Sequence, residues 1–291
     1  MKIAILGIGA IGTAIANQLA KHSAHELYLY NRSARPDLSI KVNGQASLIK
    51  TPVQTSFDEI PNLDWLIICL KEHQFEAALP TLHKLVNQAQ QIAVIRNGLR
   101  HKAPLLDIVA EERILECLID CPTQPLGNGV YEQLRPGIIR APQSDLGAAF
   151  KGLFNTNEMQ VVLSDDFKTE SWKKLCESAA LGAILCLSGE TCWIFEDERL
   201  QRLYADLLNE SITVARADGA KIEEGFDEQM LKKLLAYPPH KGSSMLTDRL
   251  NGRAIELGAK NGIISKVAKE QGTATPLNDL VVALLSHTNA S

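Results

Sequence analysis

Residues 1–12 read Met1-Lys2-Ile3-Ala4-Ile5-Leu6-Gly7-Ile8-Gly9-Ala10-Ile11-Gly12. The apolar run Lys2–Leu6 predicts a buried strand, and the apolar spacing of residues 11–21 predicts a helix directly after it. Between them lies the pattern Gly-x-Gly-x-x-Gly. In a strand–turn–helix setting the first glycine makes a tight turn, the second lets the backbone approach a pyrophosphate, and the third lets helix and strand pack closely.

This pattern predicts that the whole loop binds a dinucleotide, through Gly7, Ile8, Gly9, Ala10, Ile11 and Gly12. The N-terminus of the following helix would contribute N–H groups and a partial positive charge to the phosphates. The alternative is a glycine turn with a purely structural role. The strand and helix that flank the loop favour the binding interpretation.

The next predicted strand, residues 27–30, ends in Asn31-Arg32-Ser33. An NAD-specific fold places an Asp or Glu here to bind the ribose 2′-hydroxyl. Arg32 can instead pair with a 2′-phosphate through charge-assisted hydrogen bonds, and Asn31 beside it is a further candidate for cofactor binding. The sequence therefore favours NADP(H) over NAD(H), and a solvated arginine in a turn is the alternative.

The rest of the chain divides into two parts by pattern. Up to about residue 165 short β-rich runs alternate with helical segments, which is typical of a parallel sheet. Residues 169–187, 196–218 and 228–235 then show the 3.6-residue period of helices. We expect an α/β fold with an N-terminal Rossmann dinucleotide-binding domain over residues 1–165 and an all-α C-terminal domain over residues 166–291. Further strands expected in the first part are residues 39–42, 46–49, 65–70, 92–94, 114–118, 137–139 and 160–163. The helices expected there are residues 75–85 and 103–108.

Composition excludes several classes of partner. The chain has 291 residues and a net charge of -4, so it offers no broad positive field to nucleic acid. Its apolar runs are shorter than the roughly 20 residues that span a bilayer. No secretory signal pattern is present, and we expect a cytoplasmic protein. The six cysteines form no metal-binding spacing, so we expect reduced packing residues and no metal.

Several further motifs resemble the ketopantoate reductase (2-dehydropantoate 2-reductase) family, in order and in spacing. They are Cys69-Leu70-Lys71-Glu72-His73-Gln74, Arg96-Asn97-Gly98, Trp172-Lys173-Lys174-Leu175, Ser243-Ser244-Met245-Leu246-Thr247-Asp248, Gly252-Arg253, Glu256 and Asn261-Gly262. The resemblance implies an NADPH-dependent reduction of a 2-oxo acid to the 2-hydroxy acid. Its default substrate is ketopantoate, which gives pantoate in pantothenate biosynthesis.

The same resemblance implies roles for individual residues. The catalytic lysine falls on Lys174, as proton donor, and the glutamate beside it falls on Glu256. Lys71, Gln74 and Asn97 fall on cofactor-contacting positions, and Asn97, Ser178 and Ser244 on substrate-binding positions. Each has a structural alternative: Lys174 a solvated helix lysine, Glu256 an i,i+4 partner of Lys260, Lys71 a surface lysine, Asn97-Gly98 a plain turn, and Ser244 a helix-start serine beside Ser243. If Lys174 is catalytic, Lys173 is its exposed neighbour.

The chain also departs from the family. Positions 178 and 182, where the family has asparagines that hold the substrate, are Ser178 and Gly182, and an expected aspartate is Gly258. The proline-rich stretch 121–147 matches poorly and predicts a rigid loop. A different, bulkier 2-oxo acid is therefore an alternative substrate, and a non-catalytic NADP(H)-binding sensor an alternative function. A dehydrogenase of the 6-phosphogluconate or 3-hydroxy acid type is disfavoured because Lys-x-x-Asn is absent after Lys174. The oligomeric state stays open, with a homodimer as one alternative.

Overall fold

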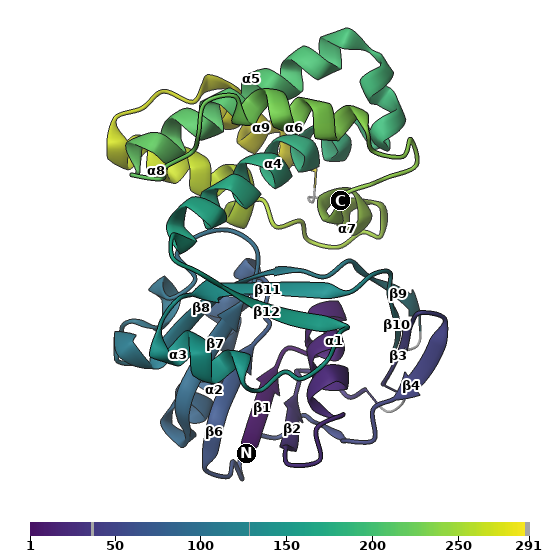
Figure 1. Cartoon of the computed structure of the whole chain (residues 1–291), viewed down its shortest axis with the longest axis vertical. Helices are drawn as coiled ribbons and strands as arrows, with labels where there is room; N and C mark the ends of the chain where they lie inside the picture. Colours follow the sequence, from purple (N-terminus) through teal and green to yellow (C-terminus); the bar gives the residue numbers. More distant parts are fainter. Residues whose placement is uncertain (36–37, 128, 289–291) are drawn as a thin grey trace. The chain divides into compact units, whose positions relative to one another are not determined.

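A computed structural model describes residues 1–35, 38–127 and 129–288. The chain forms two compact units: Met1–Arg96 with Arg100–Phe167, and Asn97–Leu99 with Lys168–Ser291 (Figure 1). Unit 1 contains sheets and helices, and the described part of unit 2 is helical. The expected fold class is therefore confirmed.

Unit 1 is built on an eight-stranded sheet within the described residues. Its strand order is β12-β11-β8-β7-β6-β1-β2-β5, and its neighbouring strands run parallel except for the antiparallel pair β8–β11. The strands are β1 (Lys2–Leu6), β2 (Glu26–Tyr30), β5 (Val53–Gln54), β6 (Leu63–Ile68), β7 (Ala89–Ile95), β8 (Ile114–Asp120), β11 (Gly137–Pro142) and β12 (Met159–Ser164).

Both faces of this sheet are buried. In β1, Ile3 and Ile5 belong to one apolar cluster and Ala4 and Leu6 to another, because successive side chains point to opposite faces. Helix α1 (Ala10–Leu19) packs into the first cluster and α2 (Phe75–Gln88) into the second, so the two helices cover opposite faces. This arrangement explains the continuous apolar runs in the parallel strands.

A second, four-stranded sheet in unit 1 has the order β4-β3-β10-β9 (Figure 1). Its strands are β3 (Ser39–Val42), β4 (Gln45–Leu48), β9 (Thr123–Gly127) and β10 (Val130–Gln133). The rigid loop predicted for residues 121–147 is therefore wrong: this stretch contains β9, β10, β11 and helix α3 (Asp145–Lys151). The helix predicted over residues 103–108 is a single 3-10 turn, Ala103–Leu105.

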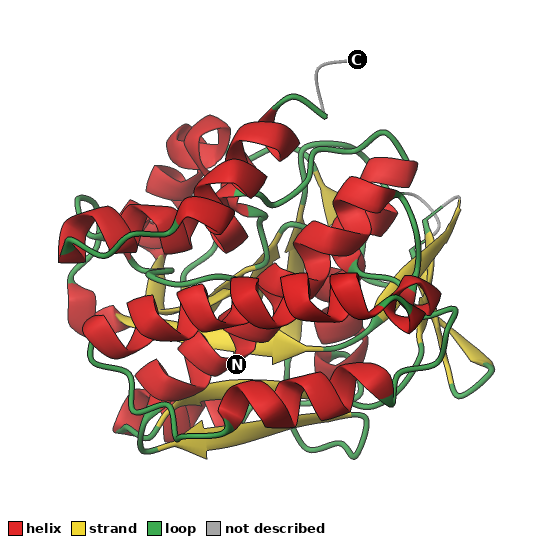
Figure 2. Cartoon of the chain, turned by 90° about the horizontal axis from the view of Figure 1, so that it is seen from above, coloured by secondary structure: helices red, strands yellow, loops and turns green. Residues whose placement is uncertain are grey.

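The described part of unit 2 consists of helices, drawn red in Figure 2, and loops. They are α4 (Phe167–Ser188), α5 (Glu198–Ala217), α6 (Phe226–Leu235), α7 (Ser244–Leu250), α8 (Ile263–Gln271) and α9 (Pro276–Ser286), with a 3-10 turn η4 (Cys192–Glu196) and a π-helical turn η5 (Gly258–Gly262). Within the described residues no helix is both long and apolar enough to span a membrane.

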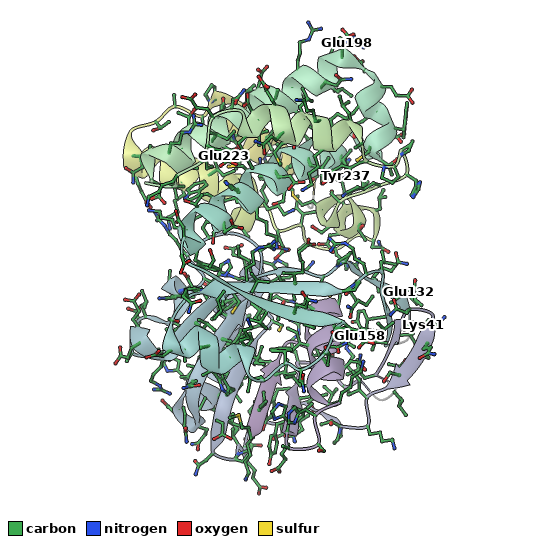
Figure 3. All side chains as sticks on the ribbon, viewed as in Figure 1. Lys41, Glu132, Glu158, Glu198, Glu223 and Tyr237 are labelled. Atoms are coloured by element: carbon green, nitrogen blue, oxygen red, sulfur yellow. The ribbon has the colours of Figure 1, made fainter. Side chains whose placement is uncertain are left out.

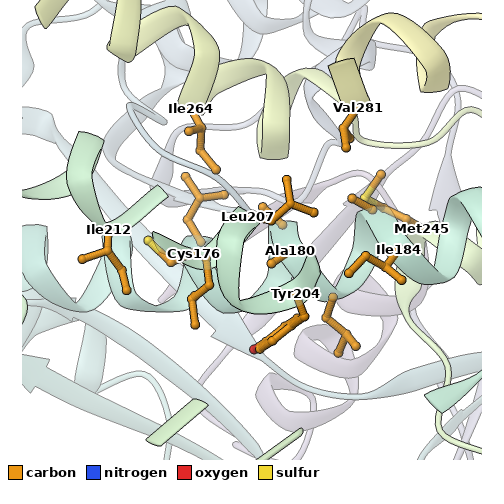
Figure 4. Packing of buried hydrophobic residues seen from close by; sticks show 14 of the residues in the cluster. Cys176, Ala180, Ile184, Tyr204, Leu207, Ile212, Met245, Ile264 and Val281 are labelled. Atoms are coloured by element: carbon orange, nitrogen blue, oxygen red, sulfur yellow. The ribbon is translucent and has the colours of Figure 1, made fainter. Parts of the chain in front are cut away.

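Helix α4 is the centre of unit 2. Its side chains Cys176, Ala180 and Ile184 lie among residues of other helices, including Tyr204 and Leu207 of α5 (Figure 4). Gly182, on the same helix, faces Met245 of α7: a Cβ at Gly182 would lie 3.0 Å from the Met245 sulfur. The packing fixes α4 against α5 and α7, and with it the direction of its polar side chains.

Candidate active site

The glycines of the loop after β1 occupy three different environments. Gly7 has a φ of +96°, and a Cβ there would lie 2.9 Å from the carbonyl oxygen of Cys69. A Cβ at Gly12 would lie 2.1 Å from the carbonyl oxygen of Gly7, so the strand and α1 pack too closely for any side chain. Gly9 is exposed, with open space where its Cβ would be. The loop is thus tight at both ends and accessible in its middle.

The accessible middle of this loop leads directly into α1. Gly9 is the N-cap residue of α1, and among the described residues no side chain caps it. The first turn of a helix has N–H groups without intrahelical partners, and these attract phosphate groups. The residues present therefore fit a dinucleotide pyrophosphate.

The end of β2 is attached to the same loop. The Gly7 N–H donates to the carbonyl oxygen of Tyr30, at 3.0 Å. The Ile8 N–H donates to Asn31 Oδ1 at 3.3 Å, and Asn31 Nδ2 donates to the carbonyl oxygen of Ser33 at 2.9 Å. Asn31 thus ties the loop to the turn that carries Arg32, whose side chain is exposed.

Lys71 and Gln74 follow β6, the strand next to β1. The Cys69 N–H donates to the Leu6 carbonyl oxygen at 2.8 Å, so both segments leave the same carboxyl edge of the sheet. The Lys71 backbone N–H donates to Gln74 Oε1 at 2.9 Å. The structure therefore places the predicted cofactor residues of unit 1 along one sheet edge, which is the usual ligand-binding edge of open α/β sheets.

The remaining predicted residues meet within unit 2. Asn97 comes directly after unit 1 in sequence but belongs to unit 2 by its contacts. Lys174 Nζ, from α4, donates to Asn97 Oδ1 at 3.3 Å, and Asn97 Nδ2 donates to Glu256 Oε2 at 3.4 Å. The amide of Asn97 thus bridges the two predicted catalytic residues. Glu256 is 6% exposed, whereas Lys174 and Asn97 are half-buried.

Gly98 holds Asn97 in this position. Its φ is +99°, and a Cβ there would lie 2.5 Å from the carbonyl oxygen of Ala259 in η5. The backbone after Asn97 can approach η5 this closely only with glycine. Asn97-Gly98 is therefore more than an ordinary surface turn.

Lys173 and Lys174 point to different partners. Lys173 Nζ lies 2.6 Å from Glu223 Oε2 and 5.6 Å from the centre of the Phe226 ring, and its side chain is 26% exposed. This bond lowers the pKa of Glu223, which is labelled in Figure 3. Lys173 is thus ion-paired and partly covered, and the expectation of an exposed neighbour is wrong.

Farther along α4 the side chains face different partners again. Glu177 Oε1 accepts from the Tyr237 hydroxyl at 2.6 Å, and Glu177 Oε2 accepts from Lys233 Nζ at 2.8 Å. Burial, followed by this bond to Glu177, raises the pKa of Tyr237, also labelled in Figure 3. Ser178 Oγ donates to the Leu175 carbonyl oxygen of its own helix at 3.4 Å.

The two serines at the start of α7 have separate roles. Ser243 is the N-cap, and its Oγ accepts from the Leu246 N–H at 3.2 Å. Ser244 is exposed, and its Oγ accepts from Lys260 Nζ at 3.5 Å. The helix-start role belongs to Ser243, which leaves the Ser244 hydroxyl beside Lys260.

Lys260 is a residue of this region to which the sequence assigned no function. It lies in η5, is only 4% exposed, and its Nζ also donates to the Ser178 carbonyl oxygen at 3.3 Å. Its position in a segment that is mostly apolar or glycine, residues 254–264, is the available signal, because lysine is rarely buried without a specific partner.

Two family comparisons cover most of the chain. Residues 3–145 match the family described as "Ketopantoate reductase PanE/ApbA", and residues 166–289 match "Ketopantoate reductase PanE/ApbA C terminal". A Caulobacter vibrioides protein named 2-dehydropantoate 2-reductase is 33% identical over 284 residues, which is 98% of each chain.

Solved structures of similar fold were also found. The dimeric ketopantoate reductase of Staphylococcus aureus superposes with a TM-score of 0.89 at 25% identity, and the match covers 100% of this chain and 99% of that one. A D-mandelate dehydrogenase solved with NADH and anilino(oxo)acetate has a TM-score of 0.88 at 20% identity, with 100% and 98% covered, and shows the shared fold.

These relatives and the two family matches establish an oxidoreductase that acts on a CH–OH/C=O pair. Both halves of the chain match consecutive parts of one family, in the order expected from the motifs. The chain therefore belongs to the ketopantoate reductase family.

Proposed function

We propose that this protein reduces a 2-oxo acid to the 2-hydroxy acid with NADPH, that ketopantoate is its substrate, and that Lys174 is the proton donor. The observation that carries the proposal is the Lys174–Asn97–Glu256 chain of hydrogen bonds, with distances of 3.3 and 3.4 Å. The Caulobacter vibrioides relative, matched over 98% of its length, supports ketopantoate as the substrate.

Lys174 supplies the group that the reaction needs most. NADPH, when bound, donates a hydride to the keto carbon, and negative charge then develops on the carbonyl oxygen. A positioned ammonium stabilises this charge and donates a proton to the same oxygen. Asn97 accepts a hydrogen bond from Lys174 and so orients the ammonium, with the Asn97 amide in turn held by Glu256.

Most of the residues proposed to hold the cofactor belong to unit 1. The loop Gly7–Gly12 and the N-terminus of α1 would bind the pyrophosphate, and Lys71 and Gln74 would contact other parts of the cofactor, as would Asn97 of unit 2. Arg32, exposed at the end of the Asn31 turn, would bind the 2′-phosphate. Ser178 and Ser244 would bind the substrate, Ser178 with the shorter reach of a hydroxyl in place of an amide.

The dimer of the Staphylococcus aureus relative supports a homodimer for this chain as well. Light scattering on the purified protein tests this point. A mass near 64 kDa, which is about twice the chain mass of 31.9 kDa, is the expected result.

The function is tested by following NADPH oxidation at 340 nm with ketopantoate and a panel of other 2-oxo acids. Turnover of ketopantoate with the highest kcat/KM is the expected result. A higher kcat/KM for a bulkier 2-oxo acid would show that this acid, and not ketopantoate, is the substrate of the same reaction. If the protein binds NADPH but oxidises it with none of the 2-oxo acids, the function that remains is a non-catalytic cofactor-binding sensor.

A further inference from the structure

Lys260 lies against α4, the helix that also carries Lys174. Its Nζ contacts the carbonyl oxygen of Ser178, which is one helical turn, about 6 Å, beyond Lys174 along α4. Its Nζ also lies 3.5 Å from Ser244 Oγ. Ser244 is exposed and Lys260 is 4% exposed, so a covered ammonium contacts an accessible hydroxyl.

Glycine at position 182 of α4 leaves space beside this ammonium. A Cβ at Gly182 would lie 3.4 Å from Lys260 Nζ and 3.0 Å from the Met245 sulfur, so a longer side chain at position 182 would occupy the space that Lys260 uses. The absence of a side chain at Gly182 of α4 therefore leaves space for the Lys260 ammonium of η5.

The π-helical turn η5 directs Lys260 to this place. Its Gly262 N–H donates to the Leu257 carbonyl oxygen at 2.9 Å, five residues back, as a π turn requires. Hydrogen bonds connect the turn to α9 and α5. Asn261 Nδ2 donates to Asn278 Oδ1 of α9 at 3.0 Å, and Asn278 Nδ2 donates to Glu210 Oε2 of α5 at 2.9 Å. Such insertions are frequent at functional sites.

We propose that the Lys260 ammonium, together with the Ser244 hydroxyl, binds the carboxylate of the substrate, so that Lys260 selects 2-oxo acids over neutral 2-oxo compounds. This inference rests on the proposed function, because it assigns the carboxylate of the same substrate whose carbonyl oxygen faces Lys174. A lysine has only donors, and a carboxylate is the strongest acceptor that a 2-oxo acid carries.

The test compares ketopantoate with its neutral primary amide in three variants. Lys260→Met removes the charge at similar length, Lys260→Arg keeps it, and Lys269→Met removes an exposed lysine of α8 as a matched control. In Lys260→Met we expect kcat/KM for the acid to fall by about 10- to 100-fold, mostly through KM, and the preference for acid over amide to fall by the same factor. Lys260→Arg is expected to retain most of the preference, and Lys269→Met all of it.

An unchanged preference in folded Lys260→Met, or equal losses on acid and amide, would overturn the inference in favour of a structural role. If Lys260→Met does not fold, Lys260→Gln provides a second neutral variant for the same comparison.

Calorimetric titration with oxamate in the presence of NADP⁺ separates this inference from the proposed function. If the parent protein reduces no 2-oxo acid, the proposed function fails. Oxamate binding that is tight in the parent and at least about tenfold weaker in Lys260→Met would still support the carboxylate site. Equal oxamate affinities would overturn it.

Discussion

Two adjacent lysines on α4 have different partners, although they are one position apart. Lys173 is ion-paired with Glu223, whereas Lys174 donates to Asn97. Composition and helical periodicity do not distinguish the two residues. Only the resemblance of the motif Trp172-Lys173-Lys174-Leu175 to the family assigns the catalytic role to Lys174. The distinction has a physical basis, since residues one apart on a helix point about 100° apart and meet different neighbours.

Replacing Arg32 tests cofactor preference at the residue scale. Because Arg32 would bind the 2′-phosphate that NADH lacks, Arg32→Ala is expected to weaken NADPH binding by about 10- to 100-fold and NADH binding by less than about threefold. The difference should shrink as salt rises, since the site is exposed. Fluorescence titration of both cofactors measures it, and equal losses would remove the 2′-phosphate role.

Residue roles could be predicted only where a local motif carried them. Lys174, Asn97 and Glu256 were predicted from separate motifs, and the structure brings them together. For Lys260 the sequence suggests only an i,i+4 helix partner of Glu256. That spacing assumes a regular α-helix, whereas η5 is π-helical and directs Lys260 toward Ser178 and Ser244.

At the scale of elements, the approach of Asn97-Gly98 to η5 can be tested with two glycines. Gly98→Ala places a Cβ 2.5 Å from the Ala259 carbonyl oxygen and so shifts Asn97 away from Lys174 and Glu256. We expect kcat for the proposed reduction to fall by more than about tenfold, because small displacements of a positioned group are costly. Steady-state kinetics with ketopantoate measures the change.

Gly252→Ala is the matched control for Gly98→Ala. Gly252 also has a positive φ, +61°, but a Cβ there meets open space. Both variants should lose about 1 kcal/mol of stability through backbone strain, so a difference in kcat isolates the contact with η5. Equal kcat values in the two variants would show that this contact does not position Asn97.

Elements were predictable where pattern and environment agree. The parallel strands β1, β6 and β7 are buried on both faces and appear in the sequence as apolar runs. In the stretch 121–147 the prolines favour a loop, whereas the structure has strands there. Pro125 lies in β9, which ends the four-stranded sheet and needs ladder hydrogen bonds on one side only, and Pro142 is the last residue of β11. Edge and end positions tolerate proline in a strand.

At the scale of the whole molecule, buried thiols couple stability to pH. Cys176 is fully buried in the core of unit 2, and burial raises its pKa far above the ordinary value. In the unfolded chain the thiol ionises at about pH 8.5. A group whose pKa is raised in the folded state stabilises it below the unfolded pKa, and this contribution is lost as pH rises.

Urea unfolding at pH 7.5 and 9.5 tests this coupling. Ionisation of the unfolded thiol should cost the parent protein about 1.4 kcal/mol between the two pH values, a loss that Cys176→Ala does not suffer. The pH-dependent loss should therefore be smaller in Cys176→Ala by that amount. Ser211→Ala, which removes a buried group that does not titrate, should keep the parent dependence. An identical pH dependence in all three proteins would refute the assignment.

The role of the Lys174 ammonium as proton donor is tested by comparing Lys174→Met with Lys173→Met. If the Lys174 ammonium protonates the carbonyl oxygen, kcat with ketopantoate should fall by about 10²- to 10⁴-fold in Lys174→Met, with NADPH affinity nearly unchanged. Lys173→Met, which loses the ion pair with Glu223 and the contact with the Phe226 ring, should stay within about threefold of the parent. A Lys174→Met protein that reduces ketopantoate at the parent rate would show that Lys174 is not the proton donor.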